Sequence, residues 1–246
     1  MHSRFKSLIL LSILLGLSLF TSYQSKAQTS QDLRILSPGT NSVVTAPIQI
    51  NASVSPGDGD LVRVILVDWQ QNLLARQVLR VNSTGHSTVE LLTDLLFEIP
   101  GESTRAMLTI ATEDQARRPI SIRSVPVILQ SSGEARIEMP IEGQPWLLIK
   151  HPNPGAEISE SPLIVVGTVE PTNDRPVIFE LINKNGNTIV TRQLRVDQPG
   201  DLIDFEVVLP YLPNSTIQDL RLVIRQTSDL PGIDAVLDSV PIRIVP

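Results

Sequence analysis

The side chains that could do chemistry in this chain are few and scattered. Outside the first residues, the histidines are His86 and His151, and neither has a second ligand at the spacing of a metal motif such as HExxH. Serines are plentiful, but no Gly-x-Ser-x-Gly nucleophile elbow occurs. We therefore predict no catalytic, cofactor-binding or metal-binding residue, and we expect a protein that is not an enzyme and has no cofactor.

Two acidic loops are the best candidates for a cation site. Asp58-Gly59-Asp60 and Asn173-Asp174 fall at corresponding points of two similar halves of the chain. Calcium needs six to eight oxygen ligands, and each loop offers two or three side chains. Asp, Asn and Gly are also the usual turn residues, so turn formation is favoured and calcium remains the weaker alternative.

The two tryptophans are the candidates for a binding surface. Trp69 lies beside Asp68 and Gln70 at the end of an expected strand, so we expect its ring to be exposed, where it could anchor a ligand such as a sugar. Trp146 lies between the two halves, where packing at a domain junction is favoured over sugar stacking. The ligand-binding residues stay unknown.

An internal repeat organises the elements that must carry these residues. A shift of 115 residues superimposes Val54 on Val169 and Leu66 on Leu181, and it places Ser124-Val125-Pro126 on Ser239-Val240-Pro241. A repeat of this length indicates a duplicated domain and not a short solenoid unit, and it is the size of an antiparallel β-sandwich. The sequence predicts one offset throughout.

Short apolar runs with period-two alternation predict six or seven strands in each copy, an all-β fold. The expected strands of copy one are 48–54, 61–68, 73–81, 87–92, 106–112 and 120–129. Those of copy two are 163–169, 177–183, 188–196, 202–209, 220–226 and 235–245. Pro and Gly between them favour tandem immunoglobulin-like antiparallel β-sandwiches.

Details of two strands yield sharper expectations. Val177, Phe179 and Leu181 alternate with a set that contains Glu180, so the first set is expected to face the core and Glu180 to lie on the opposite face. Pro126 and Pro241 cannot donate a ladder hydrogen bond, so each is expected at an edge or a bulge of its strand.

The N-terminus predicts export. Arg4 and Lys6 precede an apolar run from Leu8 to Phe20, and Ser25-Lys26-Ala27 supplies small residues at the cleavage spacing, so residues 1–27 are expected to be a signal peptide. The run is short for a membrane span, which leaves an uncleaved anchor as the alternative. We expect a secreted, periplasmic or cell-surface protein without stable membrane insertion after cleavage. The chain has no cysteine, so neither a disulfide nor a lipid on cysteine can hold it.

Charge excludes one class of partner. Loss of Arg4, Lys6 and Lys26 with the leader leaves 17 basic against 26 acidic residues, a net charge of −9. Nucleic acid requires clustered Lys and Arg, so we expect no nucleic-acid partner.

Residues 151–169, HPNPGAEISESPLIVVGTV, resemble the opening of the bacterial spore-germination-type immunoglobulin-like domain, and Phe205-Glu206 resembles a later strand of that family. The similarity covers most of residues 147–246, and copy one retains a diverged version with Ala52 in place of a glycine. The resemblance implies an extracytoplasmic module, often an accessory unit of envelope or surface proteins, without activity of its own.

These observations give one expected organisation. It comprises a signal peptide (1–27), domain 1 (31–130), a Pro- and Gly-containing linker (131–146) and domain 2 (147–246), with each domain folding as a separate unit. The expected function is non-catalytic binding or spacing in the bacterial envelope, with an envelope protein or polysaccharide as partner. The alternative is a carbohydrate-binding accessory protein that uses exposed aromatic and polar loop residues.

Overall fold

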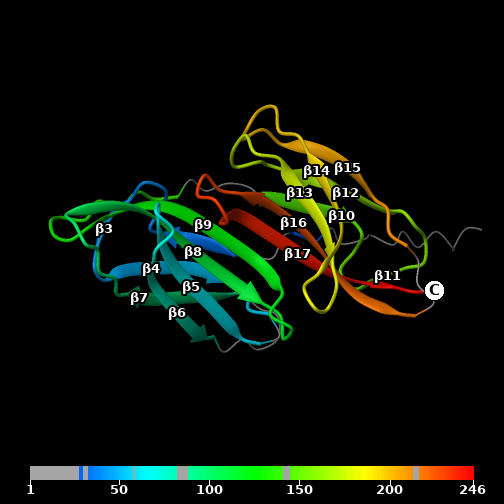
Figure 1. Ribbon diagram of the computed structural model, residues 1–246, viewed down its shortest axis with the longest axis horizontal. Coiled ribbons are helices and arrows are strands. Elements are labelled where there is room, and N and C mark those ends of the chain that lie inside the picture. The colour runs from blue at the N-terminus through cyan, green and yellow to red at the C-terminus, as the bar shows by residue number, and fades with distance from the viewer. Residues whose placement is uncertain (1–27, 30–32, 58, 82–87, 141–144, 213–215) are drawn as a thin grey trace, which may run out of the picture.

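The computed structural model describes residues 28–29, 33–57, 59–81, 88–140, 145–212 and 216–246, and in these residues it contains strands and no helix (Figure 1). Residues 1–27, which are expected to form a signal peptide, lie outside the described residues, as do His86 and Asp58.

Copy one is a sandwich of two sheets. One sheet has the order β2-β4-β7, and the other has the order β9-β8-β5-β6 with β3 parallel to β9. The strands are β2 (Arg34–Ser37), β3 (Val43–Thr45), β4 (Ile48–Val54), β5 (Leu61–Asp68), β6 (Leu73–Arg80), β7 (Val89–Leu95), β8 (Ser103–Glu113) and β9 (Pro119–Gln130).

Copy two repeats this arrangement with β10-β12-β15 opposite β17-β16-β13-β14, and β11 is parallel to β17. The short β1 (Gln28–Thr29) adds to the outer side of β10. The other strands are β10 (Leu147–His151), β11 (Ala156–Ile158), β12 (Leu163–Val169), β13 (Val177–Ile182), β14 (Thr188–Leu194), β15 (Ile203–Leu209), β16 (Gln218–Thr227) and β17 (Asp234–Ile244).

In both copies the first strand is divided into two segments. The first segment (β2 or β10) joins one sheet, and the second segment (β3 or β11) pairs in parallel with the last strand of the other sheet (β9 or β17). Two antiparallel sheets of this order make an immunoglobulin-like β-sandwich, so the predicted all-β, tandem-sandwich fold is confirmed. The expected strands did not include β2, β3, β10 and β11, because segments of three to five residues are too short to show a clear period.

Each sandwich has its own apolar core. In copy two, Val177, Phe179 and Leu181 are fully buried, as their alternation predicts, and the Phe179 ring meets the Phe205 ring edge-on at 5.0 Å. In copy one the equivalent Val62, Val64 and Leu66 are also fully buried. The alternation therefore identified the core face of β13, and the equivalent strand β5 of copy one buries the same face.

The expectation of one offset needs correction. The offset of 115 holds for β4 and β12, which have identical burial patterns, and for β5 and β13. It is 114 for β8 and β16, since Met107 pairs with Pro126 whereas Arg221 pairs with Pro241. Loops that differ by one residue explain the change, because surface loops tolerate such differences.

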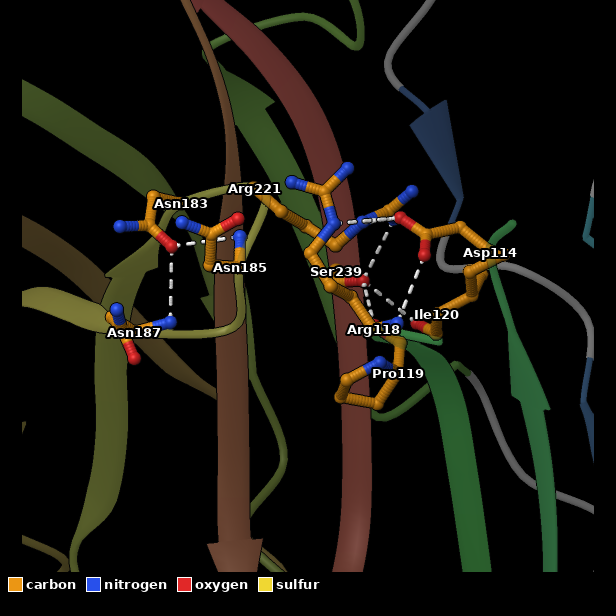
Figure 2. A network of polar contacts seen from close by, with 9 residues as sticks. All are labelled: Asp114, Arg118, Pro119, Ile120, Asn183, Asn185, Asn187, Arg221 and Ser239. Atoms are coloured by element: carbon orange, nitrogen blue, oxygen red, sulfur yellow. Dashed lines mark hydrogen bonds and ion pairs between the residues drawn. The ribbon is translucent and has the colours of Figure 1, made fainter. Parts of the chain in front are cut away.

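The turn after β5 is the same in both copies, although the Asn-Gly signal occurs only in copy two. Oδ1 of Asp68 accepts the backbone N–H groups of Gln70 and Asn72 at 2.9 and 2.8 Å. Oδ1 of Asn183 accepts the equivalent N–H groups in copy two at 2.9 and 3.0 Å (Figure 2). A carboxylate and an amide thus support one turn, because each supplies the same acceptor.

Asp68→Ala is expected to lower the free energy of unfolding by about 1–3 kcal/mol, because the turn N–H groups lose a buried acceptor. Asp68→Asn is expected to cost less than alanine, about 0.5–1.5 kcal/mol, because it keeps the Oδ1 acceptor that Asn183 supplies in copy two but loses the charged Oδ2, which accepts a hydrogen bond from the Asn72 side-chain amide at 2.8 Å. Urea denaturation of both variants measures the difference. Equal costs for the two substitutions would contradict this account of the turn.

Solvent pH should affect the same turn. Burial raises the pKa of the Asp68 carboxyl, but hydrogen bonds from the Asn72 side chain and from the N–H groups of Asn72 and Gln70 outweigh it and hold the pKa below its ordinary value. Because the pKa of Asp68 is lower in the folded than in the unfolded state, the ionised carboxylate stabilises the fold at pH values above the unfolded-state pKa. That contribution is lost as the pH falls through the folded value.

Gly167 of β12 occupies a position where no side chain fits. A Cβ there would lie 2.2 Å from the carbonyl oxygen of Leu148 and 2.7 Å from Cζ of Phe205. In copy one Ala52 pairs with the smaller Leu91 where Gly167 pairs with Phe205. The glycine therefore accompanies the larger aromatic side chain.

Gly167→Ala is expected to lower the free energy of unfolding by about 1–3 kcal/mol through overpacking. Ala52→Gly is the control, with an expected cost of about 0.5–1 kcal/mol from added chain flexibility alone. Thermal and denaturant melts compare the two. A neutral Gly167→Ala variant would mean that the backbone of β10 yields easily.

Candidate functional site

The two sandwiches meet edge to edge and share one ten-stranded sheet, in which the green β9 lies beside the red β17 (Figure 1). The register pairs Arg123 with Val236, Ile122 with Leu237, and Ser121 with Asp238. Residues 121–123 are the equivalents of 236–238 at offset 115, so equivalent segments pair antiparallel about a local two-fold axis. The duplicated copies thus pack like subunits of an isologous dimer.

The repeated Ser-Val-Pro motif supplies matching bonds across this junction. The Ser124 hydroxyl donates to the carbonyl oxygen of Asp234, and the Ser239 hydroxyl donates to the carbonyl oxygen of Pro119, each at 2.7 Å. Pro119 and Asp234 are themselves equivalent at offset 115. The motif that defines the repeat therefore also joins its two copies.

The prolines of that motif lie where the last strands change partners. β9 pairs with β17 at residues 121–123 and with β3 at 128–130, and Pro126 falls between these stretches. Pro241 falls between equivalent stretches of β17. The nitrogen of each proline thus needs no ladder partner, although β9 and β17 are interior strands of the shared sheet and not the edge strands that were one of the two expectations.

A buried ion pair lies on the core side of the junction. Asp238 has 3% of its side chain exposed. Its Oδ2 accepts hydrogen bonds from Nη2 of Arg123 at 2.8 Å and from Nε1 of Trp146 at 2.6 Å. The Ser121 hydroxyl donates to Oδ1 of the same carboxylate. Copy one, the connector and copy two therefore meet at a single carboxylate.

On the other face of the shared sheet, apolar side chains of the two copies contact each other across the junction. Ile182, Val223 and Leu237 of copy two form a small buried cluster, and Ile122 of copy one packs against it. Because Ile122 also pairs with Leu237, this cluster lies on the local two-fold axis. Burial on both faces of β9 and β17 makes the junction part of the protein interior.

A second polar network joins a hairpin loop of copy one to copy two (Figure 2). Oδ2 of Asp114 accepts a hydrogen bond from Nε of Arg118 at 2.8 Å, and it forms an ion pair with Arg221, whose Nε lies 3.4 Å away. Arg221, with 7% of its side chain exposed, also donates from Nη1 to the Ser239 hydroxyl at 2.9 Å. The loop after β8 is thus fixed to β16 and β17.

The connector follows copy one closely. Arg136 exchanges two backbone hydrogen bonds of 2.8 Å with Val43, and Gly39 donates to the carbonyl oxygen of Glu138 at 2.8 Å. Trp146 ends the connector with 8% exposure and packs in the core of copy two. Trp146 is therefore a packing residue at the junction, as predicted.

The structure corrects the expectation for Trp69. Its ring is half-buried, and the Arg105 guanidinium lies 4.4 Å from the ring centroid. A cation over an aromatic face stabilises both groups. One face of the ring is therefore taken by Arg105 and is not open for a sugar.

The candidate metal ligands that the structure describes include Asn173 and His151. Asn173 accepts a hydrogen bond from the N–H of Arg175 at 2.9 Å, which is a turn contact, and its side-chain amide donates to the carbonyl oxygen of Thr227 at the end of β16, also at 2.9 Å. His151 is exposed at the end of β10. Within the described ranges, no group of three or more His, Cys, Asp or Glu side chains could hold a metal ion.

Sequence reasoning missed the junction charges. Asp238 stands between Val236 and Val240 in the core-facing phase of its strand, and Arg221 lies in the apolar run of β16. A charge in the apolar phase is a signal of a buried partner, because an unpaired buried charge is costly. The sequence pattern does not reveal which partner that is.

Among the residues that the structure describes, no helix is long and apolar enough to cross a membrane.

Comparisons with known proteins identify no family. No family model and no curated protein matches the chain. Among solved structures, it is similar to dimeric latent PorU from Porphyromonas gingivalis (9% identity, TM-score 0.27, 88% of this chain), of which it spans 24%.

Two further structures are similar at the same level. A chimeric titin Z1Z2-Z1Z2 tandem has 10% identity and a TM-score of 0.25, with 87% of this chain and 98% of that chain covered. Drosophila OTK extracellular domains 3–5 have 15% identity and a TM-score of 0.23, with 89% and 67% covered. These scores add no argument, so the fold assignment rests on the strand order of this chain.

Proposed function

We propose that this chain is an exported, non-catalytic binding or spacer protein of the bacterial envelope whose two sandwiches act as one rigid unit. The observation that supports this is the shared ten-stranded sheet, closed by the buried Arg123–Asp238 pair. A flexible string of domains would leave such an edge solvated. The junction instead fixes the loops of both copies in one orientation, in which a single partner can meet both.

The rigid unit can be tested with spin labels, since the chain has no cysteine and introduced cysteines are unique. Labels at Val78 of β6 and Ile189 of β14, both exposed, report the two ends of the shared sheet. We expect a narrow distance distribution by pulsed electron resonance. A broad distribution would show that the copies move independently and would remove the basis for the proposal.

Export is proposed from the leader at residues 1–27. Fractionation of cells followed by intact mass and N-terminal sequencing should recover a chain that begins at Gln28 in the periplasm, medium or surface fraction. Recovery of Met1 in the envelope would overturn cleavage and favour the anchored alternative.

The partner is proposed to be an envelope protein or polysaccharide, and copy two to be a spore-germination-type immunoglobulin-like domain on the strength of residues 151–169. A pull-down from native envelope with the full mature chain, and with the spin-label variants as folded controls, is the direct test. The carbohydrate alternative predicts that Trp69→Ala abolishes glycan binding. The stacking of Arg105 on Trp69 makes this the weaker of the two.

A further inference from the structure

A cavity of about 480 Å³ opens at the junction of the two copies. The loops at residues 56–57 and 114–118 of copy one form one wall, and the paired ends of β16 and β17 form the other. Sites for small molecules usually have volumes of about 300–1,000 Å³ and often lie at domain interfaces. The cavity is therefore large enough for a small ligand.

The charges that line this cavity are mostly positive. Among the lining residues, Arg118, Arg221 and Arg243 outnumber Asp114 and Asp219 by one, and Glu157, which is not in the lining, lies 3.7 Å from Nη1 of Arg243. The chain as a whole carries a net charge of −6. A local excess of guanidinium groups in an acidic protein favours an anion, since guanidinium pairs with carboxylate and phosphate through two hydrogen bonds.

The hydrogen bonds of Arg118 are incomplete. Its backbone N–H and Nε are bonded to Asp114 at 2.9 and 2.8 Å, and its side chain is 12% exposed. Its buried Nη1 has no hydrogen-bond partner within the described part of the chain. Leaving a buried charged donor without an acceptor is costly, so an anion that supplied the acceptor would be bound favourably.

The local two-fold symmetry provides an internal comparison. At the equivalent positions Ile233 replaces Arg118, Met107 replaces Arg221 and Ile128 replaces Arg243. Asp219 alone has a charged counterpart, Arg105, which stacks on Trp69. The two copies therefore pack at the equivalent position without these three arginines, which means that packing alone does not require them.

We propose that this junction cavity binds the carboxylate or phosphate group of a small molecule. Arg118 and Arg243 hold the anionic group, and Ile120 and Leu220 contact the apolar part of the ligand. Arg221 stays with Asp114 and Ser239 and keeps the wall in place.

The test is calorimetric titration of the mature protein at low ionic strength with inorganic phosphate and, separately, with glucuronate. We expect a dissociation constant on the order of 1 mM for at least one probe. Binding of phosphate but not glucuronate, or the reverse, identifies the preferred anion, and either result supports the site. No heat and no rise in melting temperature with either probe would overturn it.

Two variants separate a binding site from a structural one. Arg243→Ala removes a side chain that is 49% exposed, so the fold should remain, and binding should weaken at least about tenfold. Asp219→Asn removes the 3.0 Å ion pair of Arg243 with Asp219, leaves its 3.7 Å pair with Glu157, and removes a negative charge that would repel the anion, so binding should strengthen by about threefold.

Arg175→Ala is the matched control, because Arg175 is 43% exposed and pairs with Asp229 outside the cavity. It should bind the probes as the wild type does. Equal weakening by Arg175→Ala and Arg243→Ala, or weaker binding by Asp219→Asn, would refute the site. The rigid-unit measurement above does not depend on these outcomes, so the two proposals fail separately.

Discussion

Asp238→Ala is expected to lower the free energy of unfolding by about 3–5 kcal/mol, because it leaves a buried arginine without its counter-charge. Arg123 has only 15% of its side chain exposed, and the Trp146 indole N–H would lose its acceptor at 2.6 Å. Denaturant melts followed by tryptophan fluorescence measure the loss, since Trp146 reports this site directly.

Two further variants show whether charge or packing is responsible. Asp238→Asn keeps an acceptor for Trp146 and should cost less than alanine. The double variant Arg123→Leu with Asp238→Leu removes both charges and should recover part of the stability lost in Asp238→Ala. If the double variant were less stable than Asp238→Ala, apolar packing could not replace the ion pair at the junction.

Leu181→Ala is expected to lower the free energy of unfolding by about 2–5 kcal/mol, because it opens a cavity in the core of copy two. Leu181 is fully buried, and no disulfide is present to limit the loss. Ile189→Ala on the neighbouring β14, at 42% exposure, should change stability by about 0.5 kcal/mol or less. Similar denaturation midpoints for the two variants would disprove the strand register.

Glu180 lies on the opposite face of β13, as its alternation predicts, but it is not a simple surface position. Its Oε2 accepts Nε of Arg225 at 2.9 Å, and Arg225 also pairs with Asp234 at 3.0 Å. Only 15% of the Glu180 side chain is exposed. Glu180→Ala should therefore cost about 1.5–3 kcal/mol and not the small effect of a surface site.

The sequence predicted the parts of the fold that depend on local patterns. Alternation placed β4, β5 and β12 with their observed ends, and it identified Leu181 as a core residue. These predictions succeed because side chains point alternately to the two faces of a strand, so the strand itself records which face is buried.

Turns were less well predicted, since different side chains can meet the same requirement. Asp68 and Asn183 support equivalent turns, yet only the Asn-Gly of copy two carries a recognised hairpin signal. The single offset of 115 likewise conflicted with the expected strands 106–112 and 220–226, which lie 114 residues apart, and strand pairing confirms the offset of 114 for β8 and β16.

The sequence by itself thus determined that the chain has two similar β-sandwiches without cysteine and which faces form their cores. Only the tertiary structure decided that the copies share a sheet, that Asp238 meets Arg123 and Trp146, and that three arginines gather at one cavity. The physical reason is the distance along the chain over which each feature is encoded. Burial periodicity is encoded within a few residues, whereas the partner of a buried charge lies more than 90 residues away and depends on how the two copies dock.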